Sequence, residues 1–253
     1  MPYGSTPTTH ILKPAIAGFD RHDLNEHLCL AAARRAGVLA ARSQVTRFGD
    51  VSAVVVERFD RRSASHAFGR VHQEDLCQAM SVPPAGKYQS EGGPGPREVA
   101  ALLRRVMRPG EAYTALWRFA DAPIWNWLIA GTDAHAKNYS ILLAGDEVRL
   151  APLYDVSSAL PYGVHEKKLR LAMKIGGDYN VSPSRNTWPR AAAELGLPAD
   201  ELIDRVCELA ERAPDAFAEA ASAPDIADMG HGLPARLADL VADRAARCLR
   251  MFA

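Results

Sequence analysis

Hydrophobic residues in the first quarter of the chain mostly follow the two-residue period of β-strands, with one helix between them. Residues 9–15 alternate until a proline ends the pattern, which predicts a strand. Residues 20–37 carry leucines at helical spacing and end on a glycine, which predicts a capped helix. Residues 44–60 predict a hairpin with Gly49 and Asp50 at its turn. Its second strand, residues 51–56, is apolar and β-branched enough to lie inside a sheet.

Helical spacing appears in the next part of the chain. Residues 61–96 are rich in turn-forming residues, and residues 91–96 predict irregular structure. Residues 97–106 carry one apolar stripe, which predicts an amphipathic helix. Residues 113–131 are apolar nearly all round, so we expect a buried central helix, or a helix pair, that Pro123 kinks or divides.

A hairpin and further helices complete the pattern. Two strands, residues 139–143 and 148–153, flank a Gly-Asp turn, and helical spacing resumes from residue 187. This order predicts a small β-rich lobe with one helix, followed by a larger helical lobe with a single hairpin. We place the boundary between Phe59 and Ala64.

The composition is that of a packed globular protein without a charge bias. Of 253 residues, 48% are hydrophobic and 24% charged, and the formal net charge is zero. This balance gives no support for a basic nucleic-acid face, and the longest apolar run is too short to span a bilayer. The first ten residues lack the features of a signal peptide. The four cysteines have no metal-ligand spacing, so we expect reduced, mostly buried thiols in a cytosolic protein.

Candidate chemistry concentrates in the stretch GTDAHAKNYSILL, directly before a predicted strand. It holds Asp133, His135, Lys137 and Asn138 within six positions, and Asp155 follows the predicted hairpin. Protein-kinase catalytic loops use the same D-x-x-x-x-N spacing followed by a later aspartate. There the first aspartate accepts the proton of the attacking hydroxyl, whereas the asparagine and the second aspartate hold Mg²⁺ on the ATP phosphates. The base must be separate from the metal ligands, because a carboxylate bound to the ion loses basicity.

The first part of the chain offers residues for the same chemistry. Lys13 lies in an early predicted strand, from which its ammonium group can neutralise the α- and β-phosphates of ATP. Glu26, on the following helix, is a candidate ion-pair partner for Lys13. The backbone of Glu57, Arg58 and Phe59 lies where the chain leaves the predicted sheet, and we expect it to meet the adenine edge.

Six segments stand out within residues 4–173, namely TPTTHILKP, VERFDRR, QEDLCQAM, KYQSEGGPG, WLIAGTDAHAKN and LAPLYDVSSALPY. In sequence and in order they resemble the HipA-type serine/threonine kinases, the toxins of bacterial toxin–antitoxin pairs. The spacing D-x-x-x-x-N would be a weak signal alone, whereas the six segments together are specific. The resemblance implies an α+β, two-lobed protein-kinase-like (HipA-like) fold. Residues 1–62 would form a truncated β-rich N-lobe, and residues 63–253 a helical C-lobe with the catalytic loop and the metal-binding hairpin.

The resemblance implies a role for each matched residue. Asp133 would be the catalytic base of Mg²⁺- and ATP-dependent phosphorylation of a serine or threonine on a protein. Asn138 and Asp155 would hold the metal. Contacts with ATP would come from Lys13, Glu57, Arg58, Phe59, His135, Ala136, Lys137, Asn138, Tyr154 and Asp155. The implied partners are a small DNA-binding antitoxin, through which DNA is contacted only indirectly, and a protein substrate in the translation machinery. The implied location is cytoplasmic, away from the membrane.

The sequence departs from the family at its start. The family's further N-terminal domain and glycine-containing phosphate loop precede the segment where this chain begins, and Gly4 is the only glycine before Gly18. We therefore expect no backbone-amide cradle for the β- and γ-phosphates. A misassigned start, a truncated gene or a split system would each explain this departure. The second hypothesis for function is a catalytically inactive remnant that acts as an antitoxin-binding or regulatory module.

Several residues have two interpretations at this stage. His135 either contacts a phosphate or orients the loop through a hydrogen bond, and Lys137 is either a phosphate ligand or a solvated charge. The glycine-rich segment 91–96 is either a shaped loop near the substrate or a simple connector. A metallohydrolase is disfavoured, because the histidine ligands that zinc centres use are missing from the cluster.

Overall fold

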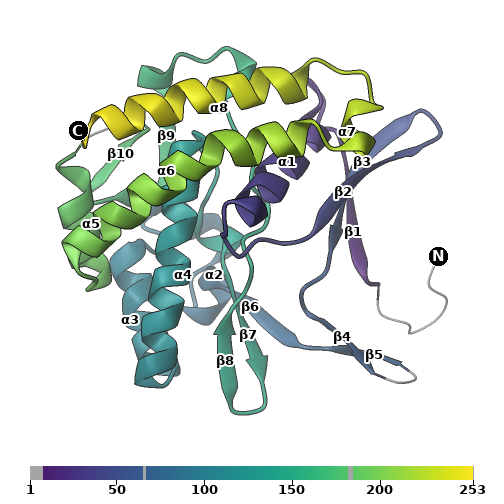
Figure 1. Cartoon of the computed structure of the whole chain (residues 1–253). Coiled ribbons are helices and arrows are strands. Elements are labelled where there is room, and N and C mark those ends of the chain that lie inside the picture. The colour runs from purple at the N-terminus through teal and green to yellow at the C-terminus, as the bar shows by residue number, and fades with distance from the viewer. Residues whose placement is uncertain (1–7, 65–66, 182–184, 253) are drawn as a thin grey trace.

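A small antiparallel sheet stands beside a larger helical body in the computed structural model, which describes residues 8–64, 67–181 and 185–252 (Figure 1). The strands β1 (His10–Pro14), β2 (Ser43–Phe48) and β3 (Val51–Glu57) are ordered β1-β3-β2. The hairpin and the inner position of its second strand are therefore confirmed. Gly4, the one early glycine, lies outside the described residues.

The helical body contains most of the predicted helices. The helices are α1 (His22–Arg35), α2 (Leu76–Ala79), α3 (Pro96–Val106), α4 (Pro109–Leu128), α5 (Thr187–Leu195), α6 (Ala199–Ala221), α7 (Pro224–Ala227) and α8 (Leu233–Arg250). The buried central helix is α4, and it runs as one helix through Pro123 rather than as two. Proline has no N–H to donate, and the remaining hydrogen bonds and the burial of both flanking turns hold the helix together.

The helix α1 joins the sheet to the helical body. Leu24 and Leu28 are fully buried in the main core, and α1 packs against β2, β3, α6 and α8. Gly37 follows the helix with a φ of +90°, a left-handed conformation that glycine adopts without strain, as the sequence predicted. The helix assigned to the small lobe thus shares its core with the helical body. The lobe boundary itself stays a prediction.

The strands differ from expectation in two ways. The turn-rich segment 61–96 forms β4 (Arg61–Ala64), β5 (Ala67–Arg70), β6 (His72–Asp75) and α2, which the sequence analysis did not predict. The hairpin of β7 (Ser140–Ala144) and β8 (Glu147–Leu150) is not the single hairpin of the helical part, because β9 (Arg170–Ile175) pairs with β10 (Asp178–Asn180). The strand β6 pairs with β7 and extends that hairpin to three strands. Its sequence HQED has no apolar alternation, so only the pairing with β7 reveals it.

A buried arginine ties the C-terminal end of α4 to the rest of the body. Arg244 of α8 donates to the backbone carbonyls of Trp127 and Leu128 and pairs with Glu166 at 2.6 Å. The last carbonyls of a helix lack partners within it, and a cation is favourable there. The loop that follows α4, which contains Asp133, therefore starts from a fixed point.

Two expectations from composition can be compared with the structure. Cys29, Cys77 and Cys248 are buried, Cys207 is half-buried, and all four are free thiols, as predicted. Within the described residues, no helix combines the length and the apolar character that crossing a bilayer requires.

Candidate active site

Lys13 lies between two carboxylates that come from distant parts of the chain. Its Nζ is 2.8 Å from Oε1 of Glu26 on α1 and 2.6 Å from Oδ1 of Asp155, which follows β8. The ion pair with Glu26 confirms the sequence hypothesis, whereas the contact with Asp155 was not predicted. Asp155 has a φ of 57°, a left-handed conformation uncommon outside Gly, Asn, Asp and His.

Burial and charge oppose each other at this ion triad. Burial raises the pKa of Glu26, whose side chain is only 2% exposed, although Lys13 pulls that pKa down. Burial lowers the pKa of Lys13, but the charges and hydrogen bonds of its two partners outweigh burial, and the pKa is raised. Lys13 is therefore protonated at neutral pH and presents a positive charge beside the exposed carboxylate of Asp155.

The residue next to Glu26 fastens α1 to the segment that follows Asp155. Asn25 is fully buried, its side-chain amide donates to the backbone carbonyl of Ser158, and it accepts from the Ser158 N–H at 2.9 Å. This reciprocal pair holds α1 and the segment after Asp155 in register. The distance between Glu26 and Asp155 is thus set by buried hydrogen bonds as well as by Lys13.

The predicted catalytic loop leaves α4 where Gly131 lies close to the buried side chain of Asn126. A Cβ on Gly131 would lie 2.3 Å from Oδ1 of Asn126, so any other residue would force that side chain to move. The loop then forms a 3-10 turn at Ala136–Asn138. The Asn138 side-chain amide donates to the backbone carbonyl of Asp133 at 3.0 Å and to that of Asp155 at 3.3 Å. Asn138 therefore joins the two aspartates, and its amide oxygen, which accepts no hydrogen bond from the described residues, can act as a ligand.

Tyr88 is a site residue that the analysis of the sequence did not identify. Its hydroxyl donates to Oδ1 of Asp133 at 2.8 Å, and this hydrogen bond, with burial, raises the pKa of Tyr88 to about 12. Its ring packs edge-on against His135, and the carbonyl of the preceding Lys87 accepts from the Ala136 N–H. The signal was present in the segment KYQSEGGPG, whose Lys87 and Tyr88 contact the catalytic loop, whereas the role of residues 91–96 stays a prediction.

Removing the Tyr88 hydroxyl tests whether it positions Asp133. Tyr88→Phe is expected to lower kcat for phosphoryl transfer by about 10- to 100-fold, the equivalent of one hydrogen bond to a charged group. Nucleotide affinity should not change, because the hydroxyl contacts the carboxylate alone. Steady-state kinetics with the matched variant Tyr113→Phe, which alters an exposed tyrosine of α4, separate the two parameters. An unchanged kcat in Tyr88→Phe would show that Asp133 needs no such support.

The other loop residues differ in what they can offer a ligand. His135 is 6% exposed, burial lowers its pKa, and its buried Nδ1 has no hydrogen-bond partner among the described residues. Ala136 is fully buried, and its N–H donates to the backbone carbonyl of Lys87. The carbonyl of Lys137 accepts from the Tyr154 hydroxyl at 2.7 Å, and its side chain is half-buried. Whether these three residues contact a nucleotide stays a prediction.

The segment 57–59 lies where the adenine contacts were expected. The Glu57 N–H donates to the Arg42 carbonyl, and the Arg58 N–H donates to the Thr9 carbonyl. In the described part of the chain the Phe59 N–H has no backbone acceptor, so it is the donor left for a ligand. The Phe59 ring packs on that of Tyr154, with centroids 5.4 Å apart.

Asp60 holds the side chains of the same segment. It accepts two hydrogen bonds from Arg58, at 2.9 and 2.6 Å, and one from Arg61 at 2.7 Å. Burial raises the pKa of Asp60, but the two guanidinium groups outweigh burial and the pKa falls below its ordinary value of 3.8. The Arg58 side chain is thus held by its ion pair with Asp60.

This carboxylate predicts an acid-dependent loss of stability. A pKa that is lower in the folded state gives stability above the unfolded value, which is lost as the pH falls through the folded value. Asp60→Asn is therefore expected to lower the free energy of unfolding at pH 7 by about 1.5–3 kcal/mol. The difference from the original chain should shrink only below about pH 4. Urea unfolding from pH 7 to pH 3 measures the loss of unfolding free energy and its dependence on pH. Asp146→Asn, in the exposed β7–β8 turn, is the control. A difference independent of pH would contradict the ionic origin.

The donor set suits magnesium better than zinc. Among the described residues there is no group of three or more His, Cys, Asp or Glu side chains arranged to hold a metal ion. Asn138 and Asp155 supply hard oxygen atoms, and magnesium is commonly held by one or two such ligands together with substrate phosphates. The residues present therefore fit magnesium bound with a nucleotide.

Comparison with known proteins adds a family and several relatives. The HipA-like C-terminal domain family matches residues 2–217. The chain is 37% identical over 221 residues to a putative kinase, Y4mE, of Sinorhizobium fredii, covering 86% of this chain and 51% of that protein. It is 31% identical over 237 residues to the serine/threonine-protein kinase toxin HipA of Shewanella oneidensis, covering 85% and 52%. The chain thus spans about half the length of both relatives.

Solved structures agree with this comparison. HipA of Shewanella oneidensis, solved in a complex with HipB and operator DNA, superposes with a TM-score of 0.79 at 26% identity, covering 96% of this chain and 59% of that chain. The proinflammatory kinase CtkA of Helicobacter pylori superposes with a TM-score of 0.58 at 12% identity, covering 96% and 88%, and supports the fold alone. The predicted α+β kinase-like fold is confirmed.

Proposed function

Because the chain belongs to the HipA-like C-terminal domain family, we propose that it binds Mg-ATP and phosphorylates a serine or threonine on a protein. One observation carries the proposal. Lys13 pairs with Glu26 and with Asp155, while Asn138 hydrogen-bonds the backbones of Asp133 and Asp155. A lysine–glutamate ion pair beside an aspartate, an asparagine and a separate base is the set of groups that kinases use for phosphoryl transfer.

Each group has a distinct role in this proposal. Lys13, oriented by Glu26, neutralises phosphate charge, and the Phe59 N–H donates to the adenine edge. Asn138 and Asp155 hold the metal, which supplies a positive charge to the phosphates when it is bound. Asp133 is exposed and has one carboxylate oxygen bound by Tyr88, so its other oxygen can accept the proton of the attacking hydroxyl.

The partners follow from the relatives rather than from the site. The Shewanella relative forms a complex with HipB and operator DNA. We extend this to a small DNA-binding antitoxin as partner of this chain, with DNA contacted through it, and to a toxin role in the cytoplasm. A protein substrate in the translation machinery belongs to the same proposal.

Calorimetric titration with Mg-ATP, followed by a transfer assay with γ-labelled ATP on candidate proteins, tests the function. Binding together with transfer would support the kinase. Binding without transfer to any candidate would favour the second hypothesis, an inactive antitoxin-binding or regulatory module. Absence of Mg-ATP binding by a folded chain would exclude the proposed site.

A further inference from the structure

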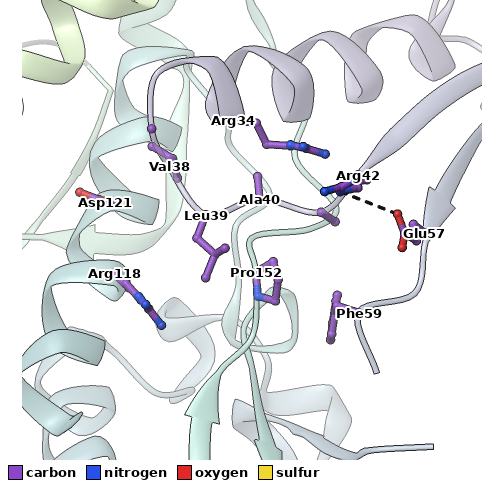
Figure 2. A pocket seen from close by; sticks show the side chains of 12 residues that line it. Arg34, Val38, Leu39, Ala40, Arg42, Glu57, Phe59, Arg118, Asp121 and Pro152 are labelled. Atoms are coloured by element: carbon purple, nitrogen blue, oxygen red, sulfur yellow. Dashed lines mark ion pairs between the residues drawn. The ribbon is translucent and has the colours of Figure 1, made fainter. Parts of the chain in front are cut away.

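A pocket lies between the end of α1, the segment 57–59 and α4. The site residues Lys13, Glu26, Asp133 and Asp155 do not line it. We call it the rear pocket and define it by Arg34, Leu39, Arg42, Phe59, Arg118 and Pro152 (Figure 2). Its volume is about 560 Å³, which lies within the range of pockets that bind small molecules. Its residues come from α1, α4 and the segments that follow α1, β3 and β8, so the fold rather than one loop creates it.

Positive charge gathers around the rear pocket. Arg34 and Arg42 point toward each other at one rim, and Arg118 reaches in from α4 on the other side (Figure 2). Only Arg42 has a carboxylate nearby, with its Nε 4.0 Å from Oε2 of Glu57. Within the described ranges, Arg34 and Arg118 have no carboxylate within ion-pair distance. The neighbouring guanidinium groups of Arg34 and Arg42 repel each other, and an anion between them would relieve this repulsion.

The nearby acid on α4 does not neutralise these arginines. Asp121 also lines the rear pocket, but Arg205 of α6 binds both of its oxygens, at 2.7 and 2.9 Å. The floor offers apolar contact, since Leu39 is 45% exposed and points between Arg118 and Pro152. Charge and shape together fit a compact molecule with two or more negative groups.

The geometry points to the rear pocket as a binding site for a small polyanion, either a polycarboxylate or a phosphate compound. Arginine suits both, because its planar guanidinium group binds carboxylate and phosphate through paired hydrogen bonds. The rear pocket does not include the centre around Lys13 and Asp155, but it adjoins the proposed nucleotide site, because Glu57 and Phe59 of the predicted adenine segment also line it. Leu39 accepts from the Leu153 N–H, and Leu153 accepts from the Ala41 N–H, so this wall is hydrogen-bonded to the strand end that leads into Tyr154 and Asp155.

Calorimetric titration of the full chain at low ionic strength with two probes tests the site. Citrate represents the polycarboxylates and inorganic pyrophosphate the phosphate compounds. We expect saturable binding of at least one probe, and the probe that binds identifies the source of the negative groups. The double variant Arg34→Gln, Arg118→Gln is expected to bind that probe at least about tenfold more weakly, because charge-assisted hydrogen bonds are lost. Failure of both probes to bind would overturn the site.

The matched control removes the same charge elsewhere. Arg35→Gln with Arg105→Gln alters exposed arginines of α1 and α3 that do not line the rear pocket, and it should bind the probe as the original chain does. Equal weakening in both double variants would mean that net charge alone attracts the anion, which would overturn the site. A Lys13→Gln variant separates the two sites. Loss of probe binding in this variant alone would place the anion in the nucleotide site and overturn the rear pocket.

Discussion

Replacing Asp133 by asparagine is expected to slow phosphoryl transfer by a factor of about 10²–10⁴, the usual contribution of a general base. Asparagine keeps the size of the side chain and an oxygen that can accept from Tyr88, but it cannot accept the proton of the attacking hydroxyl. The affinity for Mg-ATP should change little, because the carboxylate of Asp133 contacts Tyr88 and neither Lys13 nor Asn138.

The comparison needs a variant that carries the same change outside the site. Asp146→Asn lies in the exposed β7–β8 turn and alters charge equally. Single-turnover transfer and calorimetric affinity should be measured for both variants. An Asp133→Asn rate within twofold of the original chain would remove Asp133 from the role of base. A parallel loss of nucleotide affinity would instead indicate that Asp133 supports the shape of the loop.

Replacing Asp155 by alanine is expected to have the second largest effect, on Mg-ATP binding itself. Loss of residues that merely support metal ligands typically costs 10–100-fold in metal affinity, so loss of a ligand should cost at least about 100-fold. The change also removes one of the two partners of Lys13 and leaves the pair with Glu26. The loss should therefore be large for Mg-ATP and small for ATP without the metal.

Titrations with and without Mg²⁺ distinguish these two contributions. Asp146→Ala is the control, since it removes a carboxylate from the exposed turn of the same hairpin. Equal losses with and without Mg²⁺ would mean that Asp155 acts through Lys13 alone. Unchanged affinity in both conditions would exclude Asp155 from the nucleotide site.

Local patterns in the sequence located the elements that carry the site. The strand of Lys13, the helix of Glu26 and the hairpin that precedes Asp155 were each predicted from periodicity and turn residues. These features depend on neighbours within a few positions, which is why they are legible in the sequence. β6 was missed because its four polar residues are held by pairing with β7, more than sixty positions away.

The contacts that assemble the site join residues that are far apart in the sequence. Lys13 and Asp155 are 142 positions apart, and Tyr88 and Asp133 are 45 apart. The sequence indicated that Lys13, Asp133 and Asp155 serve one reaction, through spacing and a resemblance. It did not show that Lys13 touches Asp155 or that a tyrosine holds the base. Fewer backbone N–H groups can contact adenine than the sequence suggested, because those of Glu57 and Arg58 already donate to backbone carbonyls of the protein.

By itself, the sequence determined the order of elements, the family and the spacing of Asp133 and Asn138, because these depend on residues close together in the chain. Tertiary structure alone decided that α1 packs into the helical core and that Lys13 bridges Glu26 and Asp155. It also decided that arginines of α1, of the segment after α1 and of α4 surround the rear pocket. The physical reason is that burial, ion pairing and pocket shape arise from side chains that lie far apart in the sequence and meet only in the folded chain. No local pattern encodes which of those side chains meet.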